Sequence, residues 1–370
     1  MTLVKSKIGF QHVGSFLRPQ TIKDARKQLA VGEITKADLR TVEDNEIEKL
    51  IKKQAAAGLD YVTDGEFRRR YWHLDFFWGF GGVAYAHNGS QINFAHESLN
   101  DDTAVLDDQL SFDENTHPFI KDFVFTKSIA DKYAVAAKIT IPAPSQFYLE
   151  SLREKPAASV KKFYHTEQAF LDALIHVYRQ AISALYHHGA RLIQLDDCTW
   201  GFLVNAATHD AFGDPEKLQD TFIYLNNGVL ADQPADLTTN THVCRGNYQS
   251  DWAFSGGYGP VADKLFGQEN VATYFLEYDS DRAGGFEPLA KVSGDKNVVL
   301  GLVTSKSPVL EDRQVIIDRI HQAAKYLPLD RLWLSTQCGF ASTEEGNNLT
   351  EADEWRKLAL VKSIIDEVWG

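Results

Sequence analysis

The chain has 370 residues and carries 38 lysine and arginine residues against 51 aspartate and glutamate residues, which gives a formal net charge of −13. This acidic balance argues against nucleic acid as a partner, because phosphate contacts require clustered Lys and Arg side chains. No stretch approaches the roughly 20 apolar residues needed to span a bilayer, and the first residues lack an apolar signal-peptide core. The three cysteines favour a reducing compartment, so we expect a cytoplasmic protein without a membrane partner.

Short apolar runs alternate with stretches of helical periodicity along most of the chain. The expected strands span residues 8–16, 59–62, 133–141, 191–195, 236–243, 271–276, 298–303 and 332–335. The expected helices span residues 34–58, 163–188, 215–230, 312–326 and 351–368. Thr35 and Asp214 are of the residue types that cap helix N-termini, and Gly58 and Gly189 suit helix ends.

Residues 68–124 break this alternation with an aromatic cluster followed by Gly-rich and acidic sequence. We expect a long excursion that contains a β-hairpin, covers one mouth of the fold and has the aromatic cluster packed beneath it. The eight strands, mostly followed by helices, predict a single domain over residues 1–370. The predicted fold is a (β/α)8 TIM barrel with a long insertion, at about 68–124, after the second strand. A doubly wound open sheet is the alternative, and it lacks support because no GxGxxG follows the first strand.

Chemically active side chains fall at or just after the C-terminal ends of these strands. They are Glu66, Asp196, His242, Cys244, Glu277, Lys306 and Cys338. In a barrel these strand ends share one mouth, where active sites are built. We therefore expect these residues to converge although they are far apart in the sequence.

His242 and Cys244 lie two residues apart, so an extended chain places both on one face. Imidazole, thiolate and carboxylate are the ligands of Zn²⁺, and Glu277 and Cys338 extend the set. Each residue alone has a simpler interpretation, since a single cysteine is more often a small buried hydrophobe. We expect such a packing role for Cys198. Four zinc-type side chains at the same end of a barrel nevertheless favour a zinc site that activates a thiol.

Seven segments spread over nearly the whole chain resemble the catalytic C-terminal barrel of cobalamin-independent methionine synthase, in its short single-barrel form. They are HVGSF (12–16), AAGLDYVTDGEF (56–67), RLIQLDD (191–197), THVCRGN (241–247), YFLEYDS (274–280), VLGLVTSKSP (299–308) and DRLWLSTQCGF (330–340). The His-x-Cys, Glu and Cys combination is the specific part of this resemblance.

The resemblance implies a methyltransferase that uses zinc to activate the thiol of homocysteine and forms methionine. It implies that the zinc ligands are His242, Cys244, Glu277 and Cys338. It also implies that the backbone of Val13, Gly14 and Ser15 binds the homocysteine carboxylate, and that Glu66 and Asp196 bind the amino group. Two acidic side chains suit an ammonium group, and backbone N–H groups at a Gly-Ser turn suit a carboxylate.

The chain departs from the family pattern on the donor side. Lys306, in TSKSP, stands at the position of the family's general-acid histidine, and residues 195–198 read LDDC. We expect a 5-methyltetrahydrofolate as methyl donor, with a corrinoid donor or another electrophile such as an epoxide as alternatives. Lys306 is the candidate catalytic residue, as an acid if its pKa is lowered, or as a binder of an anionic group on the donor. A zinc-stabilised structural protein is the non-enzymatic alternative.

Overall fold

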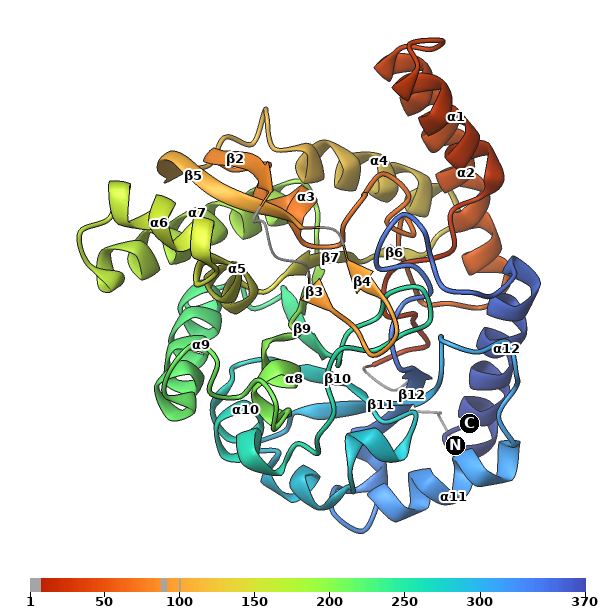
Figure 1. The fold of residues 1–370 in the computed structure, drawn as a ribbon. Coiled ribbons are helices and arrows are strands. Elements are labelled where there is room, and N and C mark those ends of the chain that lie inside the picture. Colours follow the sequence, from red (N-terminus) through yellow and green to blue (C-terminus); the bar gives the residue numbers. More distant parts are fainter. Residues whose placement is uncertain (1–7, 88–91, 100) are drawn as a thin grey trace.

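The computed structural model describes residues 8–87, 92–99 and 101–370, and places parallel strands at the centre with helices around them (Figure 1). Six strands form one parallel sheet in the order β7-β8-β9-β10-β11-β12. They are β7 (Ile139–Pro142), β8 (Leu192–Asp196), β9 (Thr238–Val243), β10 (Thr273–Glu277), β11 (Asn297–Val303) and β12 (Leu332–Thr336). All but the first residues of β9 and β11 are buried, as expected for parallel strands covered on both faces.

Two shorter strands, β1 (Tyr61–Val62) and β6 (Ala136–Ala137), form a separate parallel pair. β6 is separated from β7 by Lys138 alone, and Gln11 forms a parallel bridge with Tyr61. The parallel segments are therefore neighbours in chain order from Gln11 to β12.

The first and last of these segments meet through individual hydrogen bonds. The Phe340 N–H donates to the carbonyl oxygen of Ser15 over 2.8 Å, and Thr336 Oγ1 lies 3.3 Å from His12 Nδ1. Within the described residues, no strand ladder joins β12 to the Gln11 segment. The structure thus establishes an α/β fold with a parallel sheet, and the closed barrel stays a prediction.

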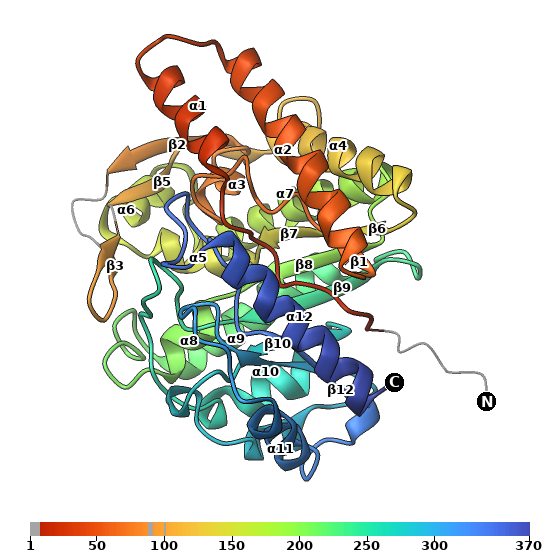
Figure 2. The same ribbon diagram turned by 90° about the vertical axis from the view of Figure 1, so that its right-hand side faces the viewer.

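Helices cover the outside of the strands, and α1 and α2 form a pair that projects from the body (Figures 1 and 2). The longer helices are α1 (Gln20–Ala30), α2 (Lys36–Ala56), α4 (Pro118–Lys132), α5 (Pro144–Ser151), α6 (Glu154–Phe163), α7 (Glu167–His187), α9 (Pro215–Leu230), α11 (Arg313–Ala323) and α12 (Glu351–Val368). The shorter ones are α3 (Leu74–Phe77), α8 (Thr199–Val204) and α10 (Ala262–Gln268). None of the helices in the described part of the chain is long and apolar enough to cross a membrane.

Several helix boundaries follow from capping residues that the sequence predicts. Thr35 forms a reciprocal capping box with Asp38 at the start of α2. The Asp214 side chain accepts a hydrogen bond from the backbone N–H of Glu216 at the start of α9. Asp312, which we expect from the sequence to be the first residue of a helix, is instead the residue that caps α11. The helix that we expected over residues 163–188 begins later, at Glu167, because Thr166 caps it.

Two expected strands differ from the structure. Of residues 8–16 only Gln11 forms a bridge. Gly9 has a φ of +67°, which is not an extended conformation, and the Phe10 N–H donates to the side chain of Asp60, a residue far away in the sequence, and not to a neighbouring strand. The strand expected at residue 133 begins at Ala136, since the preceding residues form the turn that ends α4.

The segment after β1 contains the hairpin that we expected, formed by β2 (Gly81–His87) and β5 (Asp102–Ser111) in antiparallel pairing. A smaller antiparallel pair joins β3 (Ile92–Asn93) and β4 (Ser98–Leu99). Residues 118–124, which we had placed in the excursion, belong instead to α4. Phe76, Phe77 and Phe80 are fully buried, so this part of the aromatic cluster packs in the core as predicted.

Candidate active site

A cavity of about 120 Å³ opens at the C-terminal ends of the parallel strands. Most of the predicted site residues line it, namely Val13, Gly14, Ser15, Glu66, Asp196, His242, Cys244 and Cys338. Glu277 and Lys306 are not among the described residues that line it. The cavity is therefore built from loops that follow strands far apart in the sequence.

The ligand atoms of His242, Cys244 and Cys338 all lie within 4.8 Å of one another, and all three residues are buried. His242 comes from β9, Cys244 directly follows β9, and Cys338 follows β12. The His242 Nδ1 atom lies 3.0 Å from the carbonyl oxygen of Phe275, and Nε2 lies 3.2 Å from the Cys338 sulfur. One imidazole nitrogen and two sulfurs at this separation form a donor set suited to zinc.

The charges in this group are distributed unequally. Hydrogen bonds from the Cys198 and Cys338 thiols hold the pKa of Cys244 well below its usual value, against the effect of burial. Burial and the neighbouring Cys244 thiolate raise the pKa of Cys338. Burial lowers the pKa of His242, but the hydrogen bond and charge of Cys244 outweigh it and leave the pKa raised. Cys244 is therefore the sulfur best suited to be a thiolate before any metal binds.

Glu277 lies beside Cys244, because Leu276 and Val243 are register partners in β10 and β9. Its carboxylate is fully buried and accepts hydrogen bonds from the Arg245 backbone N–H at 2.8 Å and from Arg282 at 2.7 Å. Among the described residues, the compact group of ligand atoms does not include Glu277. Each carboxylate oxygen still has a second lone pair, so these hydrogen bonds do not prevent coordination.

Glu66, which also lines the cavity, occupies an unusual backbone conformation. It has a φ of +58° and follows Gly65, which has a φ of +67°. Its Oε1 accepts a hydrogen bond from Thr140 Oγ1 at 2.9 Å, whereas its buried Oε2 has no hydrogen-bond partner among the described residues. Non-glycine residues with positive φ concentrate at functional sites, and an unpaired buried carboxylate oxygen is costly unless a ligand binds it.

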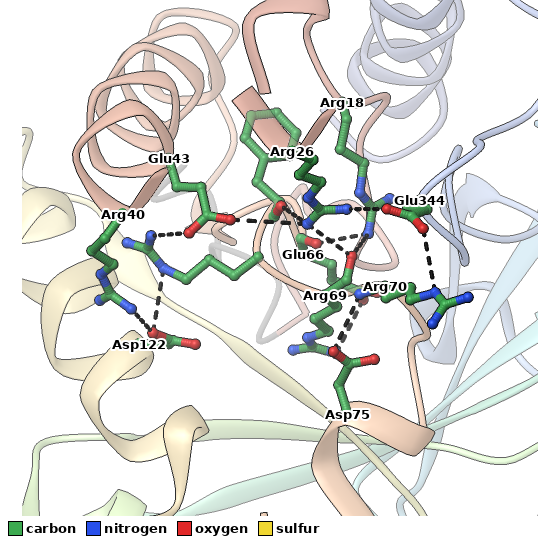
Figure 3. Close-up of polar contacts among 12 residues, drawn as sticks. Arg18, Arg26, Arg40, Glu43, Glu66, Arg69, Arg70, Asp75, Asp122 and Glu344 are labelled. Carbon is green, nitrogen blue, oxygen red and sulfur yellow. Dashed lines mark hydrogen bonds and ion pairs between the residues drawn. The ribbon is translucent and has the colours of Figure 1, made fainter. Parts of the chain in front are cut away.

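An arginine network holds this part of the chain in place (Figure 3). Arg18 donates to the backbone carbonyl oxygens of Glu66 at 2.7 Å and Arg69 at 3.2 Å. Arg69 in turn donates to the Thr140 carbonyl at 2.7 Å and lies 3.5 Å from Glu66 Oε1. Figure 3 also shows the outer contacts from Arg26 to Glu344. The network fixes the backbone and one carboxylate oxygen of Glu66.

Gly14 allows the N-terminal segment to approach Glu66 closely. A Cβ atom on Gly14 would lie 2.7 Å from Glu66 Oε1 and 3.1 Å from Thr140 Cγ2. Such a distance to a packed neighbour requires a shift, so glycine is needed here for steric reasons.

Asp196 ends β8 and faces the same cavity. Gln194 Nε2 donates to Asp196 Oδ1 at 2.7 Å, and Gln194 Oε1 accepts from Lys138 Nζ at 3.1 Å. Burial raises the pKa of Asp196 to about 7, and the nearby charge of Glu66 adds to this effect, while His242 opposes it. A cation bound between the two carboxylates would relieve their repulsion.

Lys306 lies outside the cavity lining, and its buried Nζ has no hydrogen-bond partner among the described residues. Burial lowers the pKa of Lys306, but the charges of Glu277, Cys338 and Asp279 outweigh burial and leave the pKa raised. The lowered pKa that an acid role near neutral pH requires is therefore not found.

Sequence reasoning missed several residues of the cavity wall. Cys198, expected to pack, also lines the cavity, and its sulfur lies 3.1 Å from that of Cys244. The pairing of β8 with β9, in which Asp196 and His242 are register partners, brings the two cysteines together, and this register is known only from the structure. The aromatic part of the wall comes from Trp72, Phe94, Tyr248 and Phe254, together with His73. Sequence alone does not indicate which aromatic side chains of a long loop face inward.

Comparisons with known proteins show the family to which the chain belongs. The family described as cobalamin-independent synthase, catalytic domain, matches residues 10–359. The Bacillus subtilis protein YxjH is 40% identical to this chain, and the match covers 99% of this chain and 96% of YxjH. The Bacillus subtilis protein YxjG is 41% identical, and the match covers 96% of this chain and 93% of YxjG. A Listeria monocytogenes crystal structure, of a candidate vitamin-B12 independent methionine synthase, is 36% identical with a TM-score of 0.76 and 98% of each chain covered. A B12-independent methionine synthase from Shewanella shares the fold, with a TM-score of 0.70, 16% identity and 96% of each chain covered.

The chain belongs to the cobalamin-independent methionine synthase family, whose catalytic-domain profile covers nearly its whole length, and it is a methyltransferase. This confirms the resemblance on which the expectations for the site depend.

Proposed function

We propose that this protein transfers a methyl group to the thiol of homocysteine, with zinc as its metal, and produces methionine. The observation that carries the proposal is one shared cavity: the His242, Cys244 and Cys338 group and the unpaired Oε2 of Glu66 line the same space. A metal-bound thiol and an ammonium group held in the same cavity match an amino-acid thiol. Relatives named methionine synthase, such as the Saccharolobus solfataricus protein at 24% identity over 88% of this chain and 86% of its own, support the assignment.

His242, Cys244 and Cys338 would hold the zinc ion, with Glu277 as the proposed fourth ligand. When bound there, zinc would deprotonate the incoming thiol and keep the sulfur nucleophilic at neutral pH. The Phe275 carbonyl orients His242 by accepting its Nδ1–H, which leaves Nε2 as the ligand atom.

Other residues of the cavity wall would bind the amino-acid part of the substrate. Glu66 and Asp196 would accept hydrogen bonds from the ammonium group, and the raised pKa of Asp196 would fall when that cation binds. The backbone of Val13–Ser15 would bind the carboxylate, as the resemblance implies. Gly14 keeps this backbone close to Glu66. The substrate thiol would then point towards Cys244 and Cys338.

The proposed methyl donor is a 5-methyltetrahydrofolate, and a corrinoid donor is the alternative. The aromatic side chains of Trp72, Phe94, Tyr248 and Phe254 in the cavity wall support a donor with a flat ring system. Lys306 would supply a fixed positive charge beside the ligand group rather than a proton, since its pKa is raised.

X-ray absorption at the zinc edge, with and without homocysteine, tests the proposal directly. We expect an additional sulfur neighbour when homocysteine is added, and none when methionine is added at the same concentration. An unchanged sulfur shell with homocysteine would refute thiol activation by this metal. A donor screen with homocysteine as acceptor, comparing methyltetrahydrofolate mono- and triglutamates with methylcobalamin, then identifies the donor.

A further inference from the structure

We propose that Cys198 and Cys244 are a site of reversible oxidation, at which a peroxide converts the two thiols to a disulfide and so removes Cys244 from the metal site. Their sulfur atoms lie 3.1 Å apart. Both residues line the cavity, so a small oxidant can reach them. The described chain has no disulfide in this structure, and all three cysteines are free.

The backbone positions of the two cysteines follow from the strand pairing. Asp196 and His242 are register partners in β8 and β9, and the Asp197 N–H donates to the His242 carbonyl at 2.8 Å. Cys198 and Cys244 each lie two residues beyond that pair. Neighbouring strands are about 4.8 Å apart, and a disulfide needs Cα atoms separated by roughly 4.4–6.8 Å. The two sulfurs are already 3.1 Å apart, so the bond requires them to approach each other by about 1 Å.

Gly201 keeps the two segments in contact beyond the strand ends. A Cβ atom on Gly201 would meet the Cys244 carbonyl oxygen, so the first turn of α8 lies directly against the Cys244 backbone. Because Gly201 has no side chain, α8 can approach the Cys244 backbone this closely, and a larger residue there would push the two segments apart.

Cys198 differs from Cys338 in its relation to the metal group. Cys338, His242 and Cys244 have ligand atoms within 4.8 Å of one another, whereas Cys198 is not a member of that group among the described residues. Cys198 thus lies at the edge of the ligand set, in contact with Cys244. A disulfide between them would leave only His242 and Cys338 of the compact group available to a metal. This consequence for the metal depends on the proposed function, whereas the disulfide itself does not.

The reaction balances with hydrogen peroxide as the two-electron oxidant. One sulfur attacks a peroxide oxygen, the O–O bond breaks, and water leaves as a sulfenic acid forms. The second thiol then attacks the sulfenic sulfur, the S–S bond forms and a second water leaves. Two thiols are oxidised by two electrons in total, and one peroxide is reduced to two waters. A dithiol reductant reverses the change.

Tryptic digestion separates the three cysteines, because Cys198 lies in the peptide 192–217, Cys244 in 218–245 and Cys338 in 332–356. The full-length zinc-loaded protein is treated with hydrogen peroxide, alkylated and digested without reductant. We expect a cross-link between peptides 192–217 and 218–245, with zinc released to a chromogenic chelator in step with it. A cross-link between 218–245 and 332–356 instead, or irreversible oxidation without any cross-link, would overturn the proposal.

Cys198→Ser is the matched variant, since serine preserves size and leaves the proposed metal ligands in place. We expect zinc release by peroxide to be roughly tenfold slower in Cys198→Ser, because a sulfenic acid without a neighbouring thiol is not converted to the disulfide. Equal release rates in the two proteins would overturn the proposal. The same peroxide treatment and digestion of metal-depleted wild-type protein separates the disulfide proposal from the zinc proposal. If the cross-link forms in that protein, and the reduced protein does not bind zinc, then the zinc proposal is refuted and the disulfide proposal is supported.

Discussion

The Nδ1 atom of His242 lies 3.0 Å from the carbonyl oxygen of Phe275, an atom that can only accept a hydrogen bond. Nδ1 therefore carries the proton, and the lone pair of the neutral ring is on Nε2, 3.2 Å from the Cys338 sulfur. The strand next to β9 thus orients the imidazole, because Phe275 and His242 are register partners. Such a hydrogen bond behind a histidine is typical of metal ligands.

Removing a single ligand should remove the metal. We expect His242→Ala, Cys244→Ser and Cys338→Ser each to lower zinc affinity at least roughly tenfold to a hundredfold, because each would remove one of the proposed direct ligands. Zinc content after dialysis against a weak chelator, measured by atomic absorption, checks this. Reduced Cys198→Ser serves as the control and should retain zinc. Full zinc content in both of the other two cysteine variants would contradict the site.

The Glu66 carboxylate should contribute to binding of the amino-acid end. In Glu66→Gln the unpaired Oε2 position loses its charge, so a charge-assisted hydrogen bond to the ligand ammonium is weakened. We expect methionine to bind roughly tenfold to a hundredfold more weakly by calorimetry. Glu43→Gln, in the outer part of the arginine network, is the control. Equal affinities of wild type and Glu66→Gln would exclude Glu66 as an amino-group ligand.

A methyl group at Gly14 should also disturb the position of the Glu66 carboxylate. In Gly14→Ala the new Cβ would lie 2.7 Å from Glu66 Oε1, so either Glu66 or the backbone of residues 13–15 must move. We expect methionine affinity to fall about tenfold, because site geometry tolerates shifts of only a few tenths of an ångström. In Gly267→Ala the new Cβ has no neighbour within 4 Å, so that variant should bind normally.

Stability should fall as pH rises because of a buried acid away from the cavity. Burial and the charge of Asp197 raise the pKa of Glu269 to about 8, although Asn226 donates hydrogen bonds to both carboxylates. Between its usual pKa and pH 8 the unfolded carboxyl ionises while the folded one stays protonated, so the free energy of unfolding decreases with pH. At about 1.4 kcal/mol per pKa unit, the loss from pH 5 to pH 9 is on the order of a few kcal/mol.

Glu269→Gln should remove this part of the pH dependence. Urea unfolding at pH 5.5 and pH 8.5 would show a smaller difference between the two pH values in Glu269→Gln than in wild type. Glu33→Gln, at an exposed position, should keep the wild-type difference. If the free energy of unfolding of Glu269→Gln changed between the two pH values as much as that of wild type, Glu269 would be ionised in the folded wild-type protein at both pH values.

Two substitutions separate the possible roles of Lys306. Arginine keeps the positive charge but cannot give up a proton, whereas methionine removes the charge and preserves the length of the side chain. We expect Lys306→Arg to retain kcat within a few-fold and Lys306→Met to lose most of it, since the raised pKa favours a fixed charge. A loss of roughly a hundredfold or more in Lys306→Arg would instead indicate general acid catalysis.

Much of the site could be predicted because the sequence shows where each apolar run, and therefore each strand, ends. Capping residues and glycines mark helix boundaries, and a chemically active residue directly after an apolar run is placed at the mouth of the sheet. His242, Cys244 and Cys338 come together in this way. Asp196 faces the same cavity for the same reason.

The remainder depends on relationships between segments that no local pattern encodes. Whether Cys198 packs or contacts Cys244 is decided by the register of β8 against β9. Whether Lys306 has a lowered or raised pKa is decided by the charges of Glu277, Cys338 and Asp279 around it. The first segment fails as a strand because Asp60 binds the Phe10 N–H, a contact across fifty residues.

The hydrogen bond from the Phe340 N–H to the Ser15 carbonyl joins the two ends of the chain at the cavity. Cys338 is only two residues from Phe340, whereas the other two members of the metal group lie about a hundred residues earlier in the sequence. During synthesis the chain emerges from its N-terminus, so Ser15 lacks this partner, and the proposed metal group lacks its last sulfur, until residues 338–340 have been made. We expect a nascent chain that stalls before residue 338 to be unable to assemble the site, so that any metal would bind only after Cys338 has joined His242 and Cys244.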